Sequence, residues 1–76
     1  MRRKQLRVGD RVVQITPDTS ISVGTRGILL SYNKHHIAPY YWRVKYDCSK
    51  HDGNPTEWMC SRDEIDFVKR YETKTD

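Results

Sequence analysis

The sequence has no hydrophobic run approaching the roughly 18 apolar residues that a membrane-spanning helix needs, so a transmembrane segment is excluded. Its first ten residues, MRRKQLRVGD, are basic and lack the apolar stretch of a secretory signal. Cysteine is scarce as well, because Cys48 and Cys60 are the only two. We therefore expect a cytoplasmic protein without membrane contact, in which both thiols are reduced.

Acidic residues are scarce in the first part of the chain, although the 76 residues together carry a net charge of only +4. Residues 1–46 contain nine Lys/Arg and two acids, which gives +7. Residues 47–76 contain five Lys/Arg and eight acids, which gives −3. Such a polarised distribution steers either a polyanion or an acidic protein partner towards one face.

Short β-prone runs alternate with turn-forming residues along the chain. The runs occupy residues 11–15, 28–32, 40–47, 57–61 and 66–69. The sequence DGNP at 52–55 predicts a hairpin turn between the third and fourth runs. Residues 61–65 predict one helical turn, because Ser61 can cap it and Glu64 completes a capping box. The pattern predicts an all-β fold: a small, partly open, five-stranded barrel with one short helical turn before the last strand.

Four segments carry a family resemblance: VGDRV at 8–12, GTRGILL at 24–30, RVKY at 43–46 and DEIDFV at 63–68. They resemble the Src-homology-three-like small barrels, most closely the KOW-type domains and the E-type accessory proteins of photosystem I. The resemblance implies the barrel fold, while barrels of this size serve many unrelated functions. The stretch between Val12 and Gly24 is longer than in the compact KOW pattern. We expect Gly24 and Gly27 at corners of the bent strands.

The ends of the chain differ from its middle in apolar content. We expect a flexible basic arm at 1–6, a single small β-barrel domain at 7–70 and a flexible tail at 71–76, since nothing apolar enough is seen to hold the ends down.

The segment PYYWRVKYD at 39–47 combines four aromatic rings with two cations. Side chains of a strand alternate between its faces, so the segment should present two different surfaces. The set expected in the core is Tyr40, Trp42, Val44 and Tyr46. The set expected to face solvent is Tyr41, Arg43, Lys45 and Asp47.

The outward row of Tyr41, Arg43 and Lys45 is either an ordinary solvated strand face or a nucleic-acid contact, with cations on phosphates and the ring on a base. The basic N-terminal arm favours the second interpretation, because such arms bind phosphate backbones. We expect a small regulator that binds DNA or RNA without strong sequence preference. The predicted binding residues are Arg2, Arg3, Lys4, Arg7, Arg11, Arg26, Lys34, Tyr41, Arg43 and Lys45.

The same charges also suit a protein-interaction module that docks on an acidic partner: an adaptor, an inhibitor or an accessory component of a larger assembly. An exposed edge strand could pair with that partner, and the basic face would steer the encounter. The small size suits a protein encoded by a phage or mobile element. Neither hypothesis needs a cofactor or a small-molecule substrate.

Two further patterns point to other sites. Tyr32, Tyr41 and Trp58 could line an aromatic pocket for a methylated cation or a peptide, as in Tudor domains, which this layout resembles. Cys48, His51 and Cys60 have zinc-binding side chains, but they lack two close ligand pairs, so we predict no metal site. No nucleophile stands beside a base in a setting that would lower its pKa, so we predict no catalytic residues and no enzyme activity.

Overall fold

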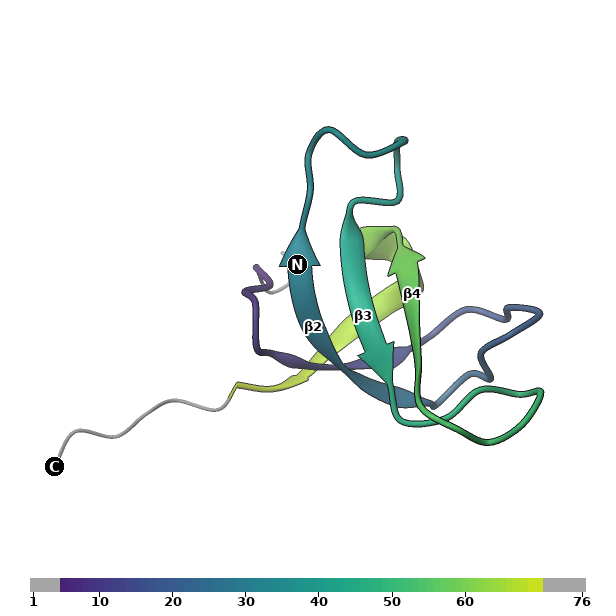
Figure 1. Ribbon diagram of the computed structural model, residues 1–76. Coiled ribbons are helices and arrows are strands. Elements are labelled where there is room, and N and C mark those ends of the chain that lie inside the picture. The colour runs from purple at the N-terminus through teal and green to yellow at the C-terminus, as the bar shows by residue number, and fades with distance from the viewer. Residues whose placement is uncertain (1–4, 71–76) are drawn as a thin grey trace, which may run out of the picture.

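The computed structural model describes residues 5–70, which form one strongly curved antiparallel sheet (Figure 1). The elements are β1 (Arg11–Gln14), β2 (Arg26–Tyr32), β3 (Trp42–Tyr46), β4 (Thr56–Cys60), the 3-10 turn η1 (Arg62–Glu64) and β5 (Ile65–Lys69). Their order across the sheet is β4-β3-β2-β1-β5. The two edge strands, β4 and β5, are not paired with each other, so the sheet is a partly open barrel. The predicted all-β fold is confirmed.

The described part of the chain contains no helix that is long and apolar enough to cross a membrane.

The five predicted strands are all present, but the third begins at Trp42 rather than at residue 40. The chain turns just before it, where the N–H of Tyr40 donates to the C=O of Ile37 at 2.9 Å. The side chains of this segment therefore begin to alternate between the two faces of the sheet only at Trp42, after this turn. The prediction that Tyr40 lies in the core is wrong, because its side chain is 44% exposed.

The core lies inside the curve of the sheet and receives alternate residues of the strands. Its buried apolar side chains are Leu6, Val12, Ile21, Leu29, Val44, Tyr46, Cys60 and Ile65. Trp42 and Phe67 are partly buried and pack against this cluster. The prediction that Trp42, Val44 and Tyr46 face inwards is therefore confirmed.

A short polar network crosses the core. The Tyr46 hydroxyl donates to Oε1 of Gln14 at 2.6 Å and lies 3.0 Å from Sγ of Cys60. Burial, followed by the hydrogen bond to Cys60, raises the pKa of Tyr46 far above that of an exposed phenol. The hydroxyl therefore stays protonated and serves as a neutral link between β1, β3 and β4.

Two glycines, in β2 and in the loop before it, stand where a larger residue would not fit the backbone. Gly24 has φ +94°, a conformation that L side chains rarely adopt. Gly27 is needed for a different reason, because its backbone packs closely against β3: a Cβ there would lie 2.7 Å from the carbonyl oxygen of Lys45. Gly24 takes the left-handed conformation expected at a corner, whereas Gly27 is required by the close approach of β3, which the sequence did not predict.

The predicted turns have the expected hydrogen bonds. In the β3–β4 connection, Oδ1 of Asp52 accepts from Oγ of Ser49 at 2.7 Å and from the N–H of Asn54 at 3.0 Å. At η1, the N–H of Ser61 donates to Oε1 of Glu64 at 2.9 Å, which is the glutamate half of a capping box.

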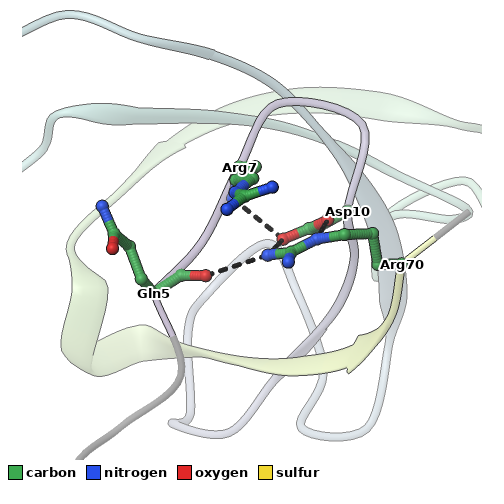
Figure 2. Close-up of polar contacts among 4 residues, drawn as sticks. All are labelled: Gln5, Arg7, Asp10 and Arg70. Atoms are coloured by element: carbon green, nitrogen blue, oxygen red, sulfur yellow. Dashed lines mark hydrogen bonds and ion pairs between the residues drawn. The ribbon is translucent and has the colours of Figure 1, made fainter. Parts of the chain in front are cut away.

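A buried carboxylate joins the two ends of the domain (Figure 2). Asp10 is 1% exposed, and its two oxygens accept from Nε and Nη2 of Arg70 at 2.8 and 3.0 Å. Arg70 also donates to the C=O of Gln5 at 3.0 Å, and Asp10 accepts from the N–H of Arg7 at 2.8 Å. The bond from Arg70 is the main cause that lowers the pKa of Asp10, against the opposing effect of burial.

This arrangement changes the expected start of the domain. Leu6 is a core residue and Gln5 is bonded to Arg70, so the last two residues of the expected arm at 1–6 belong to the folded domain. Residues 1–4 of that arm and the expected tail at 71–76 lie outside the described residues.

We expect Gly27→Ala to lower the free energy of unfolding by about 1–3 kcal/mol, because the new Cβ would force β2 and β3 apart. Urea denaturation measures the change. Ser31→Ala, at an exposed position of the same strand, should change the free energy by less than about 0.5 kcal/mol. Equal stability of the two variants would show that the strands can separate without cost.

We also expect the ion pair of Asp10 to make the fold sensitive to acid. Because the pKa of Asp10 is lowered in the folded state, its contribution to stability is present above the ordinary aspartate pKa of about 3.9 and is lost as pH falls through the lowered value. Asp10→Asn should therefore show a smaller loss of stability in acid than the wild type. Arg70→Met should cost about 3 kcal/mol at neutral pH, because it leaves a buried carboxylate without its cation.

Candidate functional site

β3 presents two cations to solvent from the middle of the sheet. Arg43 and Lys45 are exposed, whereas Val44 between them is buried, so the predicted alternation of faces is confirmed here. Nη1 of Arg43 lies 3.7 Å from Oε1 of Glu57 on β4, and both side chains are about half exposed. An exposed pair at that distance holds the arginine only weakly.

Two more of the predicted cations share this outer face of the sheet. Arg11 on β1 lies opposite Ile28, and Arg26 on β2 lies opposite Val13. Nη1 of Arg11 is 3.3 Å from Oδ1 of Asp47, so part of its charge is compensated. Within residues 5–70, Arg26 and Lys45 take part in no ion pair.

An aromatic cluster lies where β2 and β3 meet the loop that connects them, with Tyr32 and Trp42 on the face of the sheet opposite to Arg43 and Lys45. Tyr32 is opposite Trp42 in register, and their ring centroids are 4.5 Å apart. Tyr41 makes an edge contact with Tyr32, with centroids 5.9 Å apart. Tyr32 is 50% exposed, whereas Tyr41 is only partly exposed. The more accessible stacking ring is therefore Tyr32, which the pattern of strand 40–47 did not single out.

Arg7 adds a cation to the aromatic cluster. It lines an open pocket of about 540 Å³ together with Val8, Tyr32 and Trp42. Its backbone is fixed by the hydrogen bond to Asp10, which places the N-terminal segment beside the end of β2. The nearness of Arg7 to these rings depends on contacts between distant parts of the chain.

We call the region of Arg7, Tyr32, Tyr41 and Trp42 the aromatic–basic surface. Arg43 and Lys45 lie on the other face of β3. Lys34, another predicted residue, is exposed in the loop just after Tyr32. The predicted residues Arg2, Arg3 and Lys4 lie outside the described residues.

The aromatic pocket suggested by Tyr32, Tyr41 and Trp58 is not formed as a single set of rings. Ring contacts join Tyr32 to Tyr41 and Trp42. Trp58 instead lines a different pocket, together with Tyr40. Within residues 5–70, Tyr32 and Trp58 therefore belong to two separate aromatic regions.

The zinc-type side chains are also separated. Cys48 is exposed and Cys60 is buried, and both are free thiols. His51 is placed by the side chain of Ser20, 3.5 Å from its Nε2. Across the described residues, no three His, Cys, Asp or Glu side chains are grouped so that they could hold a metal ion.

Comparison of the chain with protein-family models, with curated proteins and with solved structures gave no match.

The two cysteines should differ sharply in reactivity. Cys48 is exposed, whereas burial raises the pKa of Cys60 to about 11. We expect iodoacetamide to alkylate one thiol of the native protein at neutral pH and both thiols after unfolding, as measured by intact mass. Cys48→Ser should remove the native labelling. Rapid alkylation of Cys60 in the native protein would contradict its burial.

Proposed function

We propose that the chain is a Src-homology-three-like barrel, with the layout of KOW-type domains or of the E-type accessory proteins of photosystem I, that binds single-stranded DNA or RNA through the aromatic–basic surface. The observation that carries this proposal is the half-exposed ring of Tyr32, which rests on Trp42 and lines the same pocket as Arg7. An exposed ring supported from below offers a platform for an unpaired base. A cation beside the platform attracts the phosphate of the same nucleotide.

The exposed cations of β3 would supply further phosphate contacts from the opposite face of the sheet. Arg43 lies opposite Ser31, next to Tyr32 in sequence, and Lys45 follows on the same face. Phosphate contacts and stacking are tolerant of sequence, because every base has a π-face and every nucleotide a phosphate. The protein would therefore bind without strong sequence preference and act as a nucleic-acid-associated regulator.

Docking on an acidic protein is the second candidate function, since Arg26, Arg43 and Lys45 would also attract clustered carboxylates. The two functions differ in whether they require the ring of Tyr32. Stacking needs the ring, whereas attraction of carboxylates needs only the cations.

We expect Tyr32→Ala to weaken binding of a fluorescein-labelled oligothymidine by about 5- to 100-fold, because one stacked base is lost. Fluorescence anisotropy measures the dissociation constant. Tyr32→Phe keeps the ring and should bind nearly as the wild type does, and circular dichroism checks that both variants are folded. Unchanged oligonucleotide binding by a folded Tyr32→Ala would contradict stacking, and polyglutamate binding with the same affinity would favour the acidic partner.

We expect the affinity for the oligonucleotide to fall steeply with salt. Arg43→Ala combined with Lys45→Ala should reduce the slope of log K against log salt by about 1.4, or about 0.7 for each lost phosphate contact. Lys50→Ala is the control, because it removes a cation from the β3–β4 loop, at the opposite end of β3 from Tyr32. The absence of binding at low salt, or a slope near zero in the wild type, would refute the proposal.

A further inference from the structure

An open pocket of about 630 Å³ lies against the edge strand β4 and shares no described lining residue with the pocket of Arg7 and Tyr32. Its apolar lining includes Trp58, Tyr40 and Ile37, which are 41, 44 and 76% exposed. Large apolar side chains that remain exposed together indicate a binding surface rather than part of the core.

The pocket reaches around the edge of β4. Three consecutive residues of the strand, Glu57, Trp58 and Met59, all contribute to its lining. Successive side chains of a strand point to opposite faces, so a pocket lined by all three must lie across the strand's edge. β3 is the only described strand that pairs with β4, and the other edge of β4 therefore remains available for an added strand.

The polar lining of this pocket is mainly acidic. Asp18, Glu57 and Glu64 line it together with His36, and within residues 5–70 no lysine or arginine does. Glu57 also pairs with Arg43 on the outer face of β3. One oxygen of Asp18 accepts from the N–H of Ser20 at 2.8 Å, and Glu64 is fixed in the same way by Ser61 at 2.9 Å. These bonds hold the carboxylates in place, and each carboxylate keeps further acceptor sites.

We propose that the free edge of β4 binds an extended basic segment of a partner protein as an added strand. Backbone hydrogen bonds to β4 supply the attachment. An arginine or lysine of the segment enters the pocket, where it contacts the face of Trp58 and the carboxylates of Asp18 and Glu64. This site shares no described lining residue with the pocket of Arg7 and Tyr32.

The probe is a peptide of about nine residues, a usual strand length, in which arginine alternates with threonine. Binding is followed by NMR shifts of the backbone amides of β4 and of the Trp58 indole in the full chain. We expect saturable shifts at both. The same peptide with glutamate in place of arginine should not bind, and N-methylation of its alternate backbone nitrogens should abolish the shifts in β4.

Two variants test the pocket itself. Trp58→Leu should weaken binding of the arginine peptide by about 3- to 30-fold, because the cation–π contact is lost. Asp18→Asn should weaken it by about two- to fivefold, because the amide keeps the bond to Ser20 but lacks the charge. Asp66→Asn is the matched control: Asp66 lies on the exposed face of β5 and accepts from the N–H of Phe67, which an amide oxygen can also do.

Oligonucleotide binding separates this proposal from the preceding one. Trp58→Leu should bind oligothymidine as the wild type does. Each proposal is therefore tested by its own ligand, and one can fail while the other holds. Equal affinity for the arginine and glutamate peptides, or normal peptide binding by a folded Trp58→Leu, would overturn the basic-segment proposal. Self-association of the protein through the β4 amides in the absence of peptide would show that a second copy of the chain occupies this edge. That result would also overturn the basic-segment proposal.

Discussion

The ion pair between Asp10 and Arg70 fixes the start of the domain against its end, and the position of the aromatic–basic surface depends on it. Arg70 binds both the Asp10 carboxylate and the carbonyl of Gln5, while Asp10 accepts from the backbone of Arg7 (Figure 2). Leu6 is thereby held in the core, and Arg7 comes to lie beside Tyr32. A buried carboxylate that lost its cation would cost several kcal/mol, so the constraint is strong.

Folding sorts charge by face rather than by chain half. Arg43 and Lys45 project from one face of β3, whereas the pocket at the edge of β4 gathers carboxylates. Asp18 illustrates the difference, because it belongs to the basic half of the chain yet lines the acidic pocket beside Glu64. With both proposed sites occupied, the domain would hold a polyanion and a basic protein segment at the same time.

Local patterns predicted the strands well and the surface only in part. Alternation from Trp42 to Tyr46, the turn at 52–55 and the capping role of Glu64 all depend on neighbouring residues, and each is present. Tyr40 was misplaced because the turn that closes onto Ile37 delays the start of the alternation to Trp42, two residues later than the pattern indicated. Tyr32 was not assigned a place among the stacking residues, because its exposure is set by how Trp42 and Tyr41 pack around it.

The sequence by itself determined the all-β class, the inward and outward faces of β3 and a glycine in left-handed conformation at position 24. These features follow from strand periodicity and backbone sterics, which act over a few residues. Only the tertiary structure decided that Leu6 is buried, that Arg7 joins Tyr32 and that three carboxylates share a pocket with Trp58. Those contacts join residues far apart in the chain, as the bond between Asp10 and Arg70 does, and no local pattern encodes such pairs.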